Sequence, residues 1–305
     1  MKTRQTLETV RVHGCYTEKL QPMNLTNRIY IGVHVALTVL VCVRWQHVGR
    51  APLYLVWNAV AIAAILITWR KQHSGTFWQF AHDWLPAIFF ITAFEVVSFL
   101  ALIVRGEWQN AYLIALESAL FPVVSYKWVY RFTSPWLSEL LAFGYFTFYP
   151  IYPVLGGVFW AWRHRPQFTG VFRRFTDSLS LGYALCYATY LLFPTRSPSH
   201  NGRPLSVAES SADGGPFHFL VRFIQSRAGV HGNAFPSSHI MLACVALVFA
   251  FHYFPRFAPV LLFCVLLMCV GAVYDGYHYA LDVLAGAGLG IVVGMSFTTR
   301  ETHNP

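Results

Sequence analysis

Two short polar strings near the C-terminus carry the side chains best suited to chemistry. Asn233 to His239 reads Asn-Ala-Phe-Pro-Ser-Ser-His, and Tyr277 to Asp282 reads Tyr-His-Tyr-Ala-Leu-Asp, in an otherwise apolar region. Ionisable side chains at the edge of an apolar span require a partner or a function. His278 and Asp282 are four residues apart, so on a helix they share one face, where the carboxylate can orient and activate the imidazole. This pair is a candidate nucleophile with its orienting group.

A second candidate group surrounds the Pro-Ser-Ser turn that precedes His239. Pro236 suits the first turn of a helix, where free backbone N–H groups and the helix dipole favour an anion. The hydroxyls of Ser237 and Ser238 lie at the same helix start. The turn therefore predicts a phosphate-binding seat with His239 beside it as an acid.

A third candidate is Arg196, which lies between Pro194 and Pro198 directly after an apolar run. A planar guanidinium forms two parallel hydrogen bonds to phosphoryl oxygens, and a proline-flanked backbone would hold it in place. The alternative is an interfacial anchor, because arginine often marks the end of a membrane span.

The first two groups also have structural alternatives. His278 and Asp282 can form a helix cap and a polar seam between helices, and the Pro-Ser-Ser-His turn can be a helix start alone. A metal site is a third possibility for the pair. It would need more ligands than two, and the nearby loops hold too few carboxylates and histidines to complete a shell. We therefore expect no metal and no other cofactor.

Composition indicates an integral membrane protein. Only 11% of the 305 residues are charged, against about 25% in soluble domains, and 56% are hydrophobic. The net charge of +9 comes from 22 basic residues that are spread between the apolar runs and form no stripe. A nucleic-acid partner is therefore not expected, and the expected partner is the membrane bilayer.

We expect an all-α fold, a polytopic helical bundle with about eight transmembrane helices. Runs long enough to cross roughly 30 Å of hydrocarbon lie at 28–45, 52–69, 84–104, 136–161, 175–193, 237–254, 258–275 and 278–297. Two stretches do not fit a span. Residues 107–134 mix aromatic, acidic and basic side chains, which predicts a helix lying in the membrane interface. Residues 194–235 are rich in Pro, Ser, Gly and Arg, which predicts a lid or a substrate-reading loop.

Alternation of these spans places the segment at 105–135, the loop at 194–236 and the turn at 276–278 on one side of the membrane. The opposite side carries 13 of the Lys and Arg residues and this side carries 9. The more basic side is expected to be cytoplasmic. The candidate site is then expected on the periplasmic, extracellular or lumenal face.

These strings resemble the signature motifs of the type 2 phosphatidic acid phosphatase (PAP2) superfamily: a Lys/Arg-containing first motif, PSxH, and SRxxxxxHxxxD. PSSH spans Pro236 to His239, HxxxD spans His278 to Asp282, and the first motif corresponds to Tyr190 to Pro198. Two cations of the family pattern are missing. Thr189 stands in place of the Lys, and Gly271-Ala272 stands in place of the Ser-Arg pair.

Residues 107–150 also resemble the branch of the superfamily that is related to inositol phosphorylceramide synthases. In that branch an ALxxxLF segment precedes SPWLxELL, as in Ala115 to Phe121 and Ser134 to Leu141. The branch shares the weakened phosphatase motifs. The expected division of the chain is an N-terminal segment with two or three spans (1–105), a PAP2-like catalytic membrane domain with a six-helix core (106–298) and a C-terminal tail (299–305).

The resemblance implies a metal-independent enzyme that acts on a lipid phosphate ester through a phosphohistidine. In this scheme His278 attacks phosphorus, Asp282 holds its other ring nitrogen, and His239 protonates the leaving oxygen. The residues expected to bind substrate are Arg196, Ser237, Ser238 and Tyr190. Water as acceptor makes a lipid phosphatase, and an alcohol makes a phosphotransferase. A non-catalytic protein of the same fold and an eight-span transporter are the alternatives.

Overall fold

The computed structural model describes residues 22–122, 124–132, 134–200, 215–228 and 232–298. The expected all-α class is confirmed, because these residues form helices and no strand. The α-helices are α1 (Leu25–Val43), α2 (Ala51–Lys71), α3 (Thr76–Arg105), α4 (Asn110–Leu120), α5 (Ser125–Val129), α6 (Pro135–Phe146), α7 (Phe148–Ala161), α8 (Val171–Leu192), α10 (Pro216–Ala228), α11 (Ser238–Tyr253), α12 (Ala258–Tyr274) and α13 (Ala280–Thr298).

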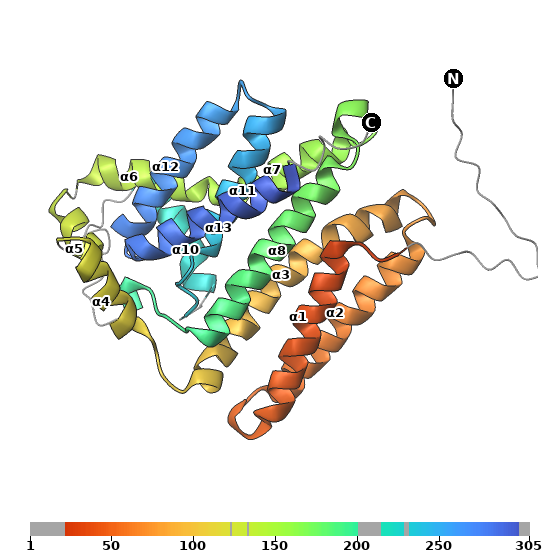
Figure 1. The fold of residues 1–305 in the computed structure, drawn as a ribbon, viewed down its shortest axis with the longest axis horizontal. Coiled ribbons are helices and arrows are strands. Elements are labelled where there is room, and N and C mark those ends of the chain that lie inside the picture. The colour runs from red at the N-terminus through yellow and green to blue at the C-terminus, as the bar shows by residue number, and fades with distance from the viewer. Residues whose placement is uncertain (1–21, 123, 133, 201–214, 229–231, 299–305) are drawn as a thin grey trace, which may run out of the picture.

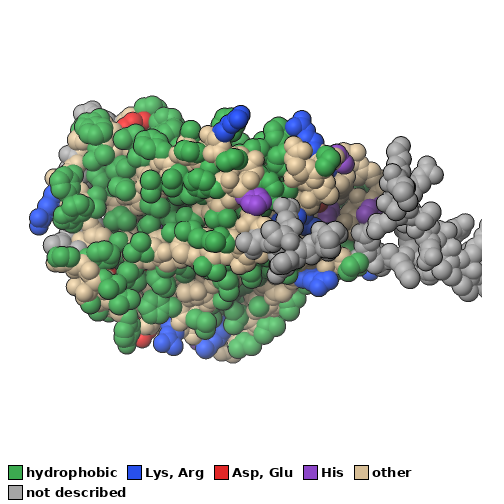
Figure 2. Space-filling model, turned by 45° about the horizontal axis from the view of Figure 1, so that its top comes forward, with side chains coloured by type: hydrophobic (Ala, Val, Ile, Leu, Met, Phe, Trp, Pro, Cys, Tyr) green, Lys and Arg blue, Asp and Glu red, His purple; other side chains and the backbone are tan. Residues whose placement is uncertain are grey.

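Several helices have the length and apolar character of membrane spans. Five segments meet both conditions: α1, α2, α3, α6 together with α7, and α13. The apolar helices α11 and α12 are shorter, and α8 has 22 residues but carries Arg173, Arg174 and Asp177 near its start. Figure 2 shows hydrophobic side chains over much of the visible surface, with Lys and Arg mostly toward its edges. The chain is a membrane protein, while the number of eight spans stays a prediction.

Helix α8 lies in the middle of the bundle (Figure 1). It packs against α1 and α3 on one side and against α11 and α13 on the other. The helices α1, α2 and α3 also pack on one another, and α12 packs on α6 and α11. The two polar strings therefore belong to a C-terminal group of helices that α8 separates from the N-terminal hairpin.

Two segments differ from the expected elements because of proline and turn chemistry. The stretch 107–134 forms α4, α5 and a short 3-10 helix rather than one helix, since Pro122 forces the extended backbone seen at Phe121. The expected span 136–161 is divided into α6 and α7 at Thr147, whose hydroxyl donates to the carbonyl of Gly144 at 2.6 Å. The helices of 107–134 are therefore shorter and more numerous than the sequence pattern predicts, while α6 and α7 together keep the length of the expected span.

Small residues on α13 let its backbone approach the start of α11. A Cβ atom at Gly286 would collide with the carbonyl oxygen of Ser237, and one at Gly290 would collide with that of Met241. Glycines four residues apart form one smooth stripe along a helix, which permits such close packing in membranes. This contact holds the Pro-Ser-Ser-His turn against the helix that follows His278.

Candidate active site

Three polar segments, which the alternation of the expected spans assigns to one side of the membrane, meet in the structure. The N–H of Gln109 donates to the carbonyl of Pro194 at 2.8 Å, which joins the start of α4 to the first motif. The N–H of Ser199 donates to the carbonyl of Gly276 at 3.0 Å, which joins that motif to the turn before His278. Backbone hydrogen bonds thus bring together residues that are far apart in the sequence.

The Pro-Ser-Ser-His turn is held from behind by the first motif. Thr195 accepts the N–H of Ala234 on its carbonyl at 3.2 Å and the N–H of Phe235 on its hydroxyl at 2.9 Å. The hydroxyl of Tyr190 donates to the carbonyl of Pro236 at 2.8 Å. Ser237 then caps α11 by accepting the N–H of Ile240. Contacts within the protein therefore hold the turn in place at several consecutive residues.

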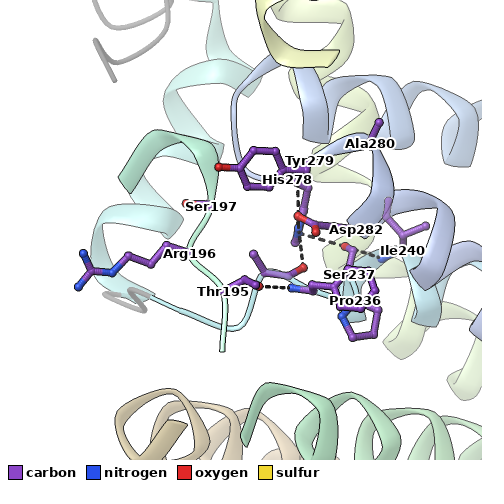
Figure 3. Close-up of polar contacts among 12 residues, drawn as sticks. Thr195, Arg196, Ser197, Pro236, Ser237, Ile240, His278, Tyr279, Ala280 and Asp282 are labelled. Carbon is purple, nitrogen blue, oxygen red and sulfur yellow. Dashed lines mark hydrogen bonds and ion pairs between the residues drawn. The ribbon is translucent and has the colours of Figure 1, made fainter. Parts of the chain in front are cut away.

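His278 lies between this turn and α13 (Figure 3). Its Nδ1 is 3.1 Å from the carbonyl oxygen of Ala234 and 3.4 Å from Asp282 Oδ2, and its Nε2 is 3.0 Å from the Ser237 hydroxyl. A carbonyl can only accept, so Nδ1 carries the proton and Nε2 accepts from Ser237. The Nε2 lone pair, which a nucleophile needs, therefore points at the Pro-Ser-Ser-His turn.

Burial lowers the pKa of His278 to about 4, although the Ala234 carbonyl opposes the shift. The side chain is neutral at neutral pH as a result. A neutral imidazole with a protonated Nδ1 is the form that can attack phosphorus through Nε2.

Asp282 is fully buried in the first turn of α13. Its Oδ2 accepts the N–H of Tyr279 at 2.8 Å, and its backbone carbonyl accepts the N–H of Ser237 at 2.9 Å. Its Oδ1 has no hydrogen-bond partner among the described residues. The structure brings His278 and Asp282 together, and the nearer Nδ1 partner is the carbonyl of Ala234.

His239 lies in the first turn of α11, with its ring centroid 6.3 Å from that of His278. It packs among aromatic rings, 4.3 Å from Phe148 and stacked at 6.0 Å on Tyr145, measured between centroids. No hydrogen bond joins its imidazole to another described residue. An aromatic cage that leaves the ring nitrogens uncommitted suits a group that exchanges protons with a ligand.

The expected substrate-binding residues divide into two groups. Ser237 and Ser238 are buried at the start of α11, beside His278. The guanidinium of Arg196 points away from the His278 cluster (Figure 3) and lies 4.4 Å from the centre of the Trp108 ring. Tyr190 is fully buried and uses its hydroxyl on Pro236, so its observed contact supports the turn rather than a substrate.

Two buried carboxylates beside the site were not singled out from the sequence. Glu117 of α4 accepts the N–H of Ala280 at 2.9 Å and the Ser125 hydroxyl at 2.6 Å on Oε1, which caps α13. Asp275 ends α12, and burial raises its pKa to about 7. The available signal was an acidic residue in an apolar setting at each position.

Asn110 was also not identified as a site residue from the sequence. Its side-chain amide accepts the N–H of Arg196 at 2.9 Å and donates to the carbonyl of the same residue at 2.8 Å. Helix α4 therefore holds the backbone of the first motif at Arg196, and these contacts do not involve the Arg196 guanidinium. Three further arginines follow the first motif in the chain. Arg222 is exposed on α10, Arg203 lies outside the described residues, and the side chain of Arg227 is likewise not described.

The described residues contain no group of three or more His, Cys, Asp or Glu side chains arranged to hold a metal ion. What the site does contain is a neutral histidine whose lone pair faces a helix start, a second histidine nearby, and buried carboxylates. These features define a membrane protein with a histidine-centred polar site between the ends of its helices.

Comparison with known proteins agrees with this class. The family model of the PAP2 superfamily matches residues 111–296, which is more than half of the chain. The chain therefore belongs to the PAP2 superfamily, and membership supports a phosphatase-like function. No curated protein and no solved structure matches the chain.

Proposed function

We propose that the protein transfers the phosphate group of a lipid phosphate ester through a phosphohistidine on His278. The observation that carries the proposal is the direction of Nε2, which accepts from the Ser237 hydroxyl at the start of α11. That is where an anion is favoured by the helix dipole and by free N–H groups. The nucleophilic atom and the expected phosphate seat thus coincide.

In the first step Nε2 of His278 attacks phosphorus, the P–N bond forms, and the bond to the leaving oxygen breaks. The Ser237 hydroxyl moves its hydrogen bond from Nε2 to a phosphoryl oxygen, which frees the lone pair. Positive charge develops on the imidazole, and Asp282 and the Ala234 carbonyl stabilise it through Nδ1–H. His239 supplies the proton to the leaving oxygen, an effect worth typically 10²–10⁴-fold.

In the second step His239 takes a proton from the incoming hydroxyl, which attacks phosphorus and releases His278. Ser238 and the first N–H groups of α11 hold the equatorial oxygens in both steps. Arg196 joins them only after its side chain leaves the Trp108 ring and turns toward Ser237. No metal enters either step of the proposal.

The acceptor in this proposal is a lipid or sugar hydroxyl, as in inositol phosphorylceramide synthases, with water as the phosphatase alternative. The support is the resemblance of residues 107–150 to that branch and the aromatic lining around His239, which includes Phe148 and Tyr145. Aromatic walls suit an acyl or isoprenoid chain and exclude water. The proposed location is the non-cytoplasmic face.

The test uses purified protein in detergent with EDTA, a panel of lipid phosphates and phosphodiesters, and added alcohols. Wild type should release or transfer phosphate, and His278→Ala should not. His47→Ala, at an exposed position away from the site, is the matched control. Brief reaction with ³²P-labelled substrate should leave an acid-labile label on wild type that His278→Ala lacks. Equal turnover by wild type and His278→Ala would contradict the mechanism.

Sidedness is tested separately with Phe219→Cys on α10, an exposed position. Exposed Cys42 is first replaced by Ser to lower the background. A membrane-impermeant thiol reagent should label Cys at 219 from the non-cytoplasmic side. Labelling only from the cytoplasm would reverse the proposed orientation.

A further inference from the structure

A second polar region lies at the opposite end of α8 from His278. A cavity of about 510 Å³ opens there between the start of α1, the α2–α3 turn and the start of α8. Its wall includes Asn24, Thr26, His73, Gln79, Asp83 and Arg173. Arg173 and Tyr190 are 17 residues apart on α8, so the two regions are about 25 Å apart at a rise of 1.5 Å per residue.

The carboxylates at this end are already hydrogen-bonded within the protein. Asn27 donates its side-chain amide to His82 Nε2 at 2.9 Å, so His82 Nδ1 carries a proton and donates to Asp83 Oδ1 at 3.1 Å. Asp83 Oδ2 accepts the indole N–H of Trp160 at 2.9 Å. Both oxygens of Asp83 are therefore occupied, and this acid offers little to a cation.

Asp177 follows the same pattern behind the cavity. Its Oδ1 accepts both the backbone N–H and the hydroxyl of Thr26, at 2.8 and 2.6 Å. Arg173 and His73 in the wall differ from these acids, because their side chains are exposed. No described residue accepts a hydrogen bond from the Arg173 guanidinium. The uncommitted charge of the cavity is therefore positive, surrounded by neutral amides and hydroxyls.

Aromatic and basic side chains around the opening indicate that it lies at the level of lipid headgroups. Phe77 and Phe80 are 72% and 46% exposed beside the lining residues Thr76 and Gln79. Lys71 lies 4.5 Å from the centre of the Trp78 ring. Aromatic and basic residues gather in this way where a helix leaves the hydrocarbon. Figure 2 shows several His, Lys and Arg side chains toward the end where the described chain begins.

We propose that this cavity binds a phosphate-bearing anion, held by Arg173 and His73 together with the amide and hydroxyl groups of the wall. A guanidinium and hydrogen-bond donors are the groups that recognise phosphate oxygens. The shared chemistry fits two sources, an anionic lipid headgroup that enters from the bilayer and a free phosphate that enters from water. This site is separate from the catalytic cluster and does not depend on the function proposed above.

The experiment measures binding in detergent by calorimetry, with His278→Ala as the background so that no probe is consumed. The probes are short-chain phosphatidylglycerol, inorganic phosphate and, as the uncharged counterpart, short-chain diacylglycerol. Arg173→Gln should weaken binding of the phosphate-bearing probe about 10-fold or more, as expected for loss of a charged hydrogen bond. Arg256→Gln, also exposed but outside the cavity wall, should bind as the background does.

A second variant, His73→Gln, tests the same cavity in case Arg173→Gln does not fold, and it should also weaken binding. Arg196→Gln distinguishes the two ends of α8. If Arg196→Gln loses binding and Arg173→Gln keeps it, the anion binds near His278, and the proposal is overturned. Tighter binding of the lipid than of inorganic phosphate identifies a headgroup, and equal binding identifies free phosphate. Binding of diacylglycerol equal to that of phosphatidylglycerol, or no binding of either phosphate probe, would also overturn it.

Discussion

The two ends of α8 use buried polar groups in opposite ways. At the end near His278, one carboxylate oxygen each of Asp282, Glu117 and Asp275 has no hydrogen-bond partner among the described residues. At the other end Asp83 has both oxygens hydrogen-bonded. Leaving a buried carboxylate oxygen unpaired costs stability. The comparison indicates that the end near His278 leaves carboxylate oxygens unpaired, whereas the other end uses its acids to hold helices together.

The largest expected effect is that of Asp282→Asn. The amide oxygen can still accept the N–H of Tyr279, so the fold is kept. Loss of the charge beside Nδ1 removes stabilisation of the imidazolium, and kcat should fall roughly 10²–10⁴-fold. Measurement of kcat beside thermal unfolding checks both parts. An unchanged kcat would show that the Ala234 carbonyl alone orients His278.

The next effect comes from the glycine stripe that joins α13 to the turn. A Cβ at Gly286 would collide with the carbonyl of Ser237, so Gly286→Ala should displace the turn from His278. A displacement near 1 Å can lower kcat about 100-fold. Gly288→Ala is the matched control, because a Cβ there meets open space. Equal activity of the two variants would show that the close contact is not needed for the site.

Glu117→Ala should lower kcat by about 10-fold and reduce stability by about 1–3 kcal/mol, because Ala280 and Ser125 lose their shared acceptor. Glu117→Gln retains an acceptor oxygen and should restore most of kcat. Steady-state kinetics should show the change in kcat rather than KM, since Glu117 acts through α13. Failure of Gln to restore activity would instead assign a role to the charge itself.

Asp83→Asn should have the reverse signature at the other end of α8. Asn has only one amide oxygen, so it cannot accept from both His82 and Trp160. One of these two N–H donors then faces the amide NH₂, which cannot accept its hydrogen bond. Stability should fall by about 1–3 kcal/mol, with kcat close to that of wild type. Thermal unfolding and kinetics on the same preparation test this. A large loss of kcat at unchanged stability would remove the contrast between the two ends.

The smallest effect is a pH dependence of stability that His278 contributes. Its pKa is about 4 in the folded chain and about 6.5 when exposed, so between these values the unfolded chain binds the additional proton. Stability therefore falls as pH drops through this window. His278→Gln should show a shallower decline in thermal unfolding temperature from pH 6.5 to 4. His47→Gln, an exposed control, should decline as wild type does.

Local spacing accounts for most of what could be predicted about the site. A spacing of four residues predicted that His278 and Asp282 meet. They do so at 3.4 Å, although His278 lies before the first residue of α13 rather than on a shared helical face. The Pro-Ser-Ser turn predicted a helix start, and α11 begins at Ser238 with Ser237 as its cap. Alternation of the spans predicted the meeting of the polar segments. The position of Arg196 against Trp108 could not be predicted. A long side chain can reach several neighbours, and tertiary packing decides which neighbours lie within its reach.

The sequence by itself determined that this is a helical membrane protein of the PAP2 superfamily, because composition, apolar runs and the PSSH and HxxxD strings are local properties. Tertiary structure decided which atoms meet: Nε2 of His278 with Ser237, Glu117 with the start of α13, and Asp83 with the indole N–H of Trp160. These contacts join residues from 41 to 163 positions apart. Their geometry follows from helix packing, which no short segment specifies alone.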